Sequence, residues 1–266
     1  MKVYPLKRCF MKLFFTILIF TGLLMLPASG EEAGTRKTDT MTAADIMQEA
    51  TVLGRAPDMY LKIVMEIHTR KGDKSRTLEV YYKQDGPETR TLIQITEPAF
   101  LRKMKFLTHT YKDGSKARWL KTSGSTRRLS GADSNEPLFD SDFTVEDLSG
   151  FELDQFRLTY TDREQYNGRP CDVITAAAIA KNNQYSSKRF YVDAETGIVQ
   201  RVDYLDSSNA LVKQYKMTAN QEVNGQIFPA ECTMETFKDK SMTTIRINTV
   251  KTDKAIPDKY FNKGNL

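Results

Sequence analysis

The stretch Leu61-Lys62-Ile63-Val64-Met65-Glu66-Ile67-His68, residues 61–68, decides the fold class of this chain. Apolar side chains at positions 61, 63, 65 and 67 alternate with polar ones at 62, 66 and 68. Successive side chains of a strand point to opposite faces of a sheet, so this period of two predicts a half-buried strand. Leu78, Val80 and Tyr82 repeat the pattern after the turn at 71–73.

Further strand candidates continue on the C-terminal side of this pair. Asn167-Gly168, Asn224-Gly225 and Asp113-Gly114 supply the positive φ angles that tight hairpin turns require. A dozen or so strands joined by short turns predict a mainly β protein with a large, curved, antiparallel sheet. The candidates lie near residues 89–97, 103–111, 117–121, 126–130, 156–166, 171–178, 188–193, 198–205, 211–223, 226–237 and 241–252.

Two short helices are expected beside the strands. The first begins at the capping box Thr42-x-x-Asp45, has apolar residues at helical spacing, and meets a C-cap glycine at Gly54. The second lies in a long connection between Ser130 and Phe151 and is expected from Thr144-x-x-Asp147 to the residue before Gly150. Connections of this length in a compact domain are often binding loops or lids.

The N-terminal thirty residues have the pattern of a cleavable signal peptide. Basic residues precede an uncharged apolar run from Leu13 to Leu26, and small residues fill positions 27–30. This run is shorter than the roughly 20 residues of a membrane-spanning helix, which favours a signal peptide over an anchor. Cys9 precedes the run, where a lipoprotein cysteine would follow it. We therefore expect export, a flexible lead-in at 31–41 and a single domain at 42–266.

Charge and cysteine content exclude several classes of protein. Four of the 39 basic residues lie in the first thirty, which leaves 35 beside 34 acidic ones, so nucleic-acid binding is not expected. Two histidines are too few for most histidine-based metal sites, and no metal or cofactor is predicted. Cys171 and Cys232 could form a disulfide in an oxidising compartment, or they could be two buried thiols.

Motifs of catalysis are lacking in the sequence. It contains no Gly-x-Ser-x-Gly elbow, no phosphate-binding loop and no His-Glu-x-x-His pair, so we do not expect an enzyme. The acidic pairs Asp140/Asp142 and Glu146/Asp147 could serve acid–base chemistry, but their position at a helix start favours capping. A curved sheet with one apolar face must be filled by its own side chains and a helix, or by a ligand, and the alternation leaves both interpretations open.

The middle of the chain resembles a known family. Arg118-Trp119-Leu120, Thr126-Arg127-Arg128-Leu129-Ser130-Gly131 and Asp140-Ser141-Asp142-Phe143-Thr144-Val145-Glu146-Asp147-Leu148 are similar to successive segments of the outer-membrane lipoprotein-sorting proteins, the LolA-like proteins. Asp140 stands where that family often has glycine, and Val145 where it has an aromatic residue. Ile256-Pro257-Asp258 near the C-terminus matches as well, so the resemblance covers about residues 42–266.

The resemblance implies an incomplete β-barrel around an apolar cavity, covered by an N-terminal helix and a short lid helix. It implies a periplasmic carrier that shuttles the acyl chains of a lipid or lipoprotein, with an inner-membrane RND-type export pump or an outer-membrane acceptor as partner. The alternative is an envelope-stress sensor that uses the same half-barrel to detect lipoproteins. The expected cavity lining comprises Leu61, Ile63, Met65, Ile67, Leu78, Val80, Tyr82, Phe106 and Phe143.

Four further residues form a motif that is expected to link the lid to the barrel: Trp119, Arg127, Arg128 and Asp142. Arg127 or Arg128 could pair with Asp142 in a charge-assisted hydrogen bond. Contact of the arginines with a ligand is the other interpretation of the same motif.

Overall fold

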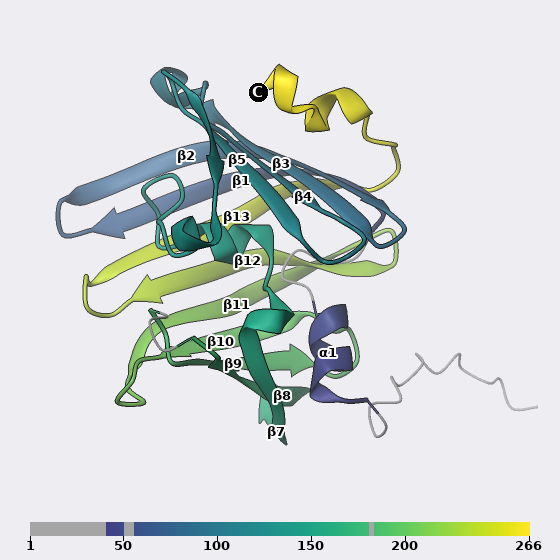
Figure 1. Ribbon diagram of the computed structural model, residues 1–266, viewed down its shortest axis with the longest axis vertical. Helices are drawn as coiled ribbons and strands as arrows, with labels where there is room; N and C mark the ends of the chain where they lie inside the picture. The colour runs from purple at the N-terminus through teal and green to yellow at the C-terminus, as the bar shows by residue number, and fades with distance from the viewer. Residues whose placement is uncertain (1–40, 51–55, 181–183) are drawn as a thin grey trace, which may run out of the picture. The chain divides into compact units, whose positions relative to one another are not determined.

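Thirteen strands make one curved antiparallel sheet that is not closed. The protein is described by a computed structural model over residues 41–50, 56–180 and 184–266. The predicted signal peptide, residues 31–40 of the lead-in and Gly54 lie outside these residues. The first helix ends at Glu49 with the extended Ala50 as its C-cap, so the predicted cap at Gly54 is wrong. The mainly β prediction is confirmed, and each predicted strand has its counterpart (Figure 1).

The strands follow one another in a meander with one change of order. The sequence of neighbours is β6-β5-β4-β3-β2-β1-β13-β12-β11-β10-β9-β8-β7, so β1 pairs with both β2 and β13. The strands are β1 (Asp58–Thr69), β2 (Gly72–Asp85), β3 (Glu88–Glu97), β4 (Lys105–Thr110), β5 (Lys116–Lys121), β6 (Thr126–Leu129), β7 (Phe156–Tyr166), β8 (Arg169–Ala178), β9 (Ser187–Asp193), β10 (Val199–Leu205), β11 (Leu211–Val223), β12 (Gln226–Thr236) and β13 (Ser241–Lys251).

Both helices begin at the predicted capping boxes. Thr42 caps α1 (Ala43–Glu49), and Thr144 caps α2 (Val145–Ser149), with the side chains of Asp45 and Asp147 closing the two boxes. Helix α2 ends at Gly150, whose φ of 86° lies in the region that favours glycine. Among the described residues, no helix is long and apolar enough to cross a bilayer.

The alternation of the strands creates two apolar faces of different size. On the inner face, strands across the whole sheet contribute to one large cluster of buried side chains, in which Leu61 and Val80 are cross-strand partners. On the outer face, Tyr81, Leu92, Leu107 and Trp119 of β2 to β5 form a second cluster. Strands with apolar residues on both faces must be covered twice to remove those residues from water.

The C-terminal segment covers the outer cluster. Residues 256–266, which include η5 (Asp258–Phe261) and η6 (Lys263–Asn265), pack Ile256 and Phe261 against it. Tyr260 stacks on Tyr81 with ring centroids 4.1 Å apart, and Lys83 donates to Asp258 at 2.8 Å.

The connection from β6 to β7 joins the two free edges of the sheet. These strands are the first and last in the order of neighbours, so residues 130–155 must run across the sheet. We call this stretch, with its short helices η3 (Gly131–Asp133), α2 and η4 (Leu153–Gln155), the plug segment. It lies over the inner face (Figure 1).

Candidate functional site

The plug segment fills the inner face of the sheet with apolar side chains. Leu138, Phe139, Phe143 and Val145 are each at most 4% exposed and belong to the inner cluster. Phe151 stacks on Phe156 with centroids 4.3 Å apart and meets Phe190 edge-on at 5.0 Å. In this conformation the inner face of the sheet is therefore covered by the plug segment of the same chain.

The predicted lining residues come together on this inner face. Eight of the nine are buried in the inner cluster, and the ninth, Tyr82, is half-buried against it. Phe143 belongs to the plug segment and lies edge-on to Tyr215 with centroids 6.5 Å apart. The region expected to be a cavity is thus packed with side chains in the described conformation. Of the two interpretations left open by the sequence, filling by the protein's own side chains is the one that this structure shows.

A buried ionic cluster fixes helix α2 to the sheet. Lys213 of β11 donates to the carboxylate of Asp147 at 2.7 Å, and the hydroxyl of Tyr204 donates to the other oxygen at 2.5 Å. Lys188 of β9 donates to Glu146 at 2.8 Å. The ammonium groups also lie over aromatic rings, with Lys213 4.9 Å from the ring of Tyr204.

The lysines of the cluster keep Asp147 ionised. Burial alone would raise the pKa of this carboxyl, but the charges of Lys213 and Lys188 outweigh it and lower the pKa to about 2. The same negative charge, added to burial, raises the pKa of Tyr204 well above its ordinary value. Tyr204 therefore stays protonated and donates, while Asp147 accepts from Lys213, Tyr204 and the Thr144 cap.

Asp142 makes a second polar attachment between the plug segment and β13. Its carboxylate accepts from the hydroxyls of Ser241 at 2.5 Å and Thr243 at 2.8 Å. Its backbone N–H donates to the Thr243 oxygen at 2.9 Å. Since this residue is buried, each of these hydrogen bonds replaces a bond to water that the packed segment has lost.

Strand β5 holds the C-terminal part of the plug segment. Arg118 of the Arg-Trp-Leu motif is 3% exposed and donates to the Ser149 hydroxyl at 2.9 Å and to the carboxylate of Glu152. Lys116 donates to the carbonyl of Gly150 at 2.6 Å. Burial, helped by the nearby charge of Arg118, lowers the pKa of Lys116 to about 8.

The arginines and the tryptophan of the motif do not make the expected link to Asp142 of the plug segment. Arg127 of β6 pairs with Asp133 at 2.9 Å and with Glu136 at 2.5 Å, both at the start of the plug segment, and Arg128 is exposed. The predicted pairing of either arginine with Asp142 is therefore wrong, because both arginines are exposed on the edge strand β6, whereas Asp142 is buried against Ser241 and Thr243 of β13. Trp119 faces the outer cluster, since it alternates with Arg118, and so it does not link the plug segment to the sheet.

Four residues that attach the plug segment to the sheet were not predicted in this role from the sequence: Arg118, Asp147, Lys188 and Lys213. Lysines on strands usually lie on solvated faces. A signal for the two lysines was present, because Lys213 alternates in phase with the apolar Tyr215, as Lys188 does with Phe190. A charged residue in phase with a buried face indicates a buried ion pair.

The two cysteines are free and lie on opposite faces. Cys171 is buried in an outer cluster with Val173 and Tyr191, whereas Cys232 is buried in the inner cluster. The alternative of two buried thiols therefore describes this structure, and burial raises the pKa of both thiols to about 12.

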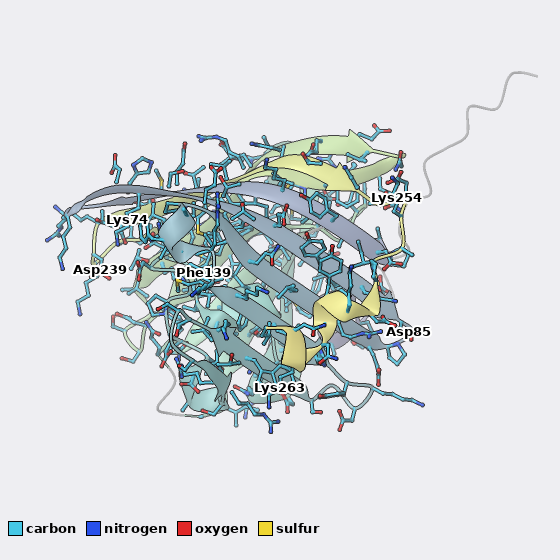
Figure 2. The ribbon with its side chains drawn as sticks, turned by 90° about the horizontal axis from the view of Figure 1, so that it is seen from above. Lys74, Asp85, Phe139, Asp239, Lys254 and Lys263 are labelled. Atoms are coloured by element: carbon cyan, nitrogen blue, oxygen red, sulfur yellow. The ribbon has the colours of Figure 1, made fainter. Side chains whose placement is uncertain are left out.

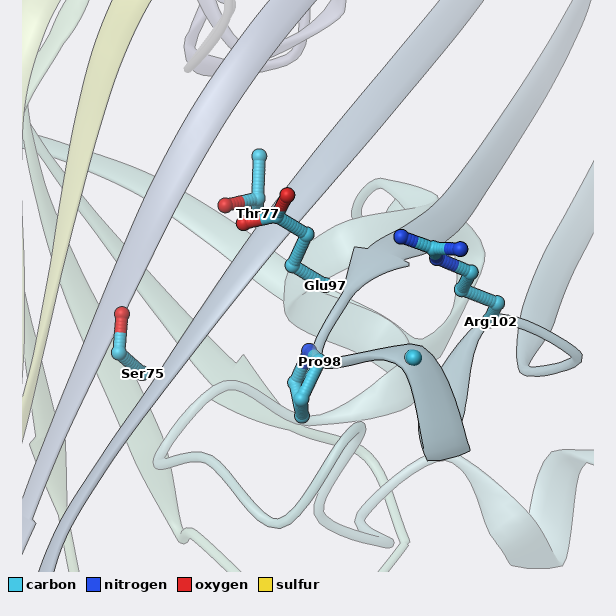
Figure 3. A pocket seen from close by; sticks show the side chains of 6 residues that line it. Ser75, Thr77, Glu97, Pro98 and Arg102 are labelled. Carbon is cyan, nitrogen blue, oxygen red and sulfur yellow. The ribbon is translucent and has the colours of Figure 1, made fainter.

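A shallow pocket lies away from the predicted lining. It has a volume of about 360 Å³ and is lined by Ser75, Thr77, Glu97, Pro98, Ala99 and Arg102 (Figure 3). Its polar side chains do not suit acyl chains. No group of three or more histidine, cysteine or acidic side chains that could hold a metal ion occurs in the described part of the chain.

Solved structures share this architecture at low sequence identity. A DUF1329 family protein from Desulfovibrio piger matches with a TM-score of 0.73 and 24% identity over 84% of this chain and 95% of that chain. A domain assigned to outer membrane lipoprotein sorting, from Vibrio parahaemolyticus, matches with a TM-score of 0.72 and 19% identity over the same shares. A LolA superfamily protein from Nitrosomonas europaea has a TM-score of 0.66 and 18% identity over 85% of this chain and 100% of that chain.

Sequence comparison adds the family. No curated protein matches the sequence. The model of a family described as "Uncharacterized protein" matches residues 87–266, which include the plug segment, both motif strands and the C-terminal segment. The chain therefore belongs to the family that this model describes, and it shares its fold with the solved structures above.

Proposed function

We propose that this protein is a carrier that binds the acyl chains of a lipid or lipoprotein against the inner face of its sheet. The observation that carries the proposal is the continuous apolar inner face, covered by a connection and not by a further layer of sheet. A flexible acyl chain and an apolar plug segment can occupy the same face in turn. The similarity to a domain assigned to outer membrane lipoprotein sorting supports the same class of ligand.

An acyl chain and the plug segment would both be held on the inner face by the burial of apolar surface. Each buried methylene contributes roughly 0.8 kcal/mol, so a dozen methylenes contribute about 10 kcal/mol before ordering losses. Displacing the plug segment exposes its aromatic residues, and it also breaks the ion pairs of Asp147 and Glu146. Cargo binding would therefore be a net exchange of apolar contacts, strong enough for capture and weak enough for release.

The cellular setting belongs to the same proposal. A signal peptide at 1–30 would export the chain, and residues 42–266 would act as one lipid-binding domain in the periplasm. An RND-type pump in the inner membrane or an acceptor at the outer membrane would then donate or receive the cargo. The similarity to a lipoprotein-sorting domain supports this setting, and the cargo itself is proposed only as a class.

The proposal is tested on protein purified from the envelope of cells that export it. Native mass spectrometry followed by organic extraction is expected to find a co-purified acyl lipid. Met65→Glu places a charge on the inner face and should abolish that lipid, whereas the matched control Val64→Glu, on the outer face of the same strand, should keep it.

A second variant keeps the test decisive if Met65→Glu does not fold. Tyr82 is half-buried at the margin of the inner cluster, so Tyr82→Glu should fold and still reduce uptake of a fluorescent fatty acyl probe. Lipid-free wild-type protein that also takes up no probe would contradict the proposal. Equal uptake by wild type and Tyr82→Glu, with probe bound elsewhere, would contradict the assignment of the inner face.

A further inference from the structure

The antiparallel order of the sheet places alternate turns on the same rim. We call the rim formed by the turns at 69–74, 97–104, 121–126, 206–211 and 237–242 the basic rim. In Figure 1 the turns between β1 and β2, β12 and β13, and β10 and β11 follow one another along the left edge of the sheet. In Figure 2, Lys74 and Asp239 of this rim lie on one side, and Asp85 and Lys254 of the opposite turns lie on the other.

Exposed apolar side chains are concentrated on this rim. Among the described residues, seven large hydrophobic side chains are exposed, and five of them lie at these turns or in the β8–β9 connection on the same rim. Phe100, at the tip of the β3–β4 turn, is 79% exposed. The five residues are Phe100, Ile179, Leu211, Phe237 and Met242.

The rim also has a distinct charge. Its five turns contain eight lysine and arginine residues and four acidic ones. One of the acids, Asp206, accepts hydrogen bonds from Ser208 and Ala210 within its own turn. The opposite turns contain five basic and six acidic residues and one of the exposed hydrophobic side chains, Tyr111; they span residues 85–88, 111–116, 166–169, 193–198, 223–226 and 251–255.

From this placement we propose that the basic rim docks on the surface of an anionic phospholipid bilayer. Basic side chains attract an anionic leaflet, and their aliphatic stems tolerate the interface. Phe100 lies on the β3–β4 turn, whereas Phe237 and Met242 lie on the β12–β13 turn, so the exposed apolar side chains are spread along the rim and can enter the headgroup region at two places. A protein-binding hot spot would instead gather its anchors in one central patch. This surface is separate from the inner face and does not depend on the proposed cargo.

Vesicle sedimentation tests how much the basic side chains contribute to membrane binding, with protein purified from the envelope of cells that export it. Wild type should bind vesicles of phosphatidylethanolamine with phosphatidylglycerol and should bind phosphatidylcholine vesicles weakly. Lys71→Glu with Lys238→Glu should weaken binding to the anionic vesicles by roughly tenfold to a hundredfold. The matched control, Lys112→Glu with Lys254→Glu, makes the same change of charge on exposed residues of the opposite turns and should stay within about twofold of wild type.

The apolar contribution has its own pair of variants. Phe100→Ser should weaken binding by about tenfold, whereas Tyr111→Ser on the opposite turns should not. All these variants should keep normal uptake of the acyl probe. If wild type takes up no probe but binds anionic vesicles, the carrier proposal is contradicted and the docking proposal is not. Docking is contradicted if wild type does not bind anionic vesicles, if both rims contribute equally, or if the rim captures only a protein.

Discussion

Asp147→Asn is the substitution that most directly loosens the plug segment. It removes one charge, keeps the side-chain volume, and leaves Lys213 buried without its counter-charge. A pKa of about 2, against an ordinary value of 3.8, corresponds to about 2 kcal/mol of stabilisation. Because the lysine is left buried without a partner, the whole cost of breaking the pair is larger, about 3–5 kcal/mol.

The expected result is a local opening. A loss of about 3–5 kcal/mol in plug docking raises the population of the open state by roughly 150-fold to 5,000-fold. Hydrogen exchange read by mass spectrometry should therefore accelerate in peptides from residues 138–150 and change little in β12 and β13. The rate of acyl-probe uptake should rise in the same variant.

Asp133→Asn is the matched control. Asp133 is also an acid of the plug segment, but its partners Arg127 and Ser130 lie within its own stretch of chain. Its removal should leave exchange in 138–150 and uptake of the probe unchanged. Unchanged exchange in Asp147→Asn, or equal acceleration throughout the sheet, would refute the reasoning that this cluster holds the plug.

Three further predictions concern the pH dependence of Asp147, the packing of Phe261 and the attachment by Asp142. The pKa of Asp147 is depressed in the folded state, so this carboxylate stabilises the protein above about pH 4, and the stabilisation is lost as the pH falls toward 2. Urea unfolding of wild type should therefore show a loss of about 2 kcal/mol between these pH values, and Asp147→Asn should not show it. Phe261→Ala should lower the free energy of unfolding, measured in urea, by about 3–5 kcal/mol without changing probe uptake, because Phe261 packs on the outer face. Reduced uptake by fully folded Phe261→Ala protein would contradict this. Asp142→Ala should cost about 1–3 kcal/mol, since the hydroxyls of Ser241 and Thr243 lose their acceptor, and exchange in the plug segment should rise; an unchanged midpoint would count against this attachment.

The strands were predictable because their signal is local. Alternation such as Leu61 to Ile67 reports which side chains share a face, and the turns at Asn167-Gly168 and Asn224-Gly225 report where the chain reverses. The two capping boxes are local for the same reason. These features needed no knowledge of distant contacts.

The attachments of the plug segment were not predictable in the same way. Alternation assigns Trp119 and Arg118 to opposite faces, but it does not say which face the plug covers or that the C-terminal segment returns over the other. The partner of Asp142 lies about a hundred residues away on β13, and no local pattern pairs them. Whether the inner face is filled or open also depends on the whole sheet, and alternation alone left both possibilities.

Photo-crosslinking shows whether acyl chains bind where the plug segment now lies. A fatty acid with a photoreactive terminal group is bound to the protein, irradiated, and mapped by peptide mass spectrometry. We expect labels on inner-face residues of β1 and β2, such as Leu61 and Leu78, with increased labelling in Asp147→Asn. Labels confined to the outer face or to the rim turns, or no saturable labelling, would contradict it.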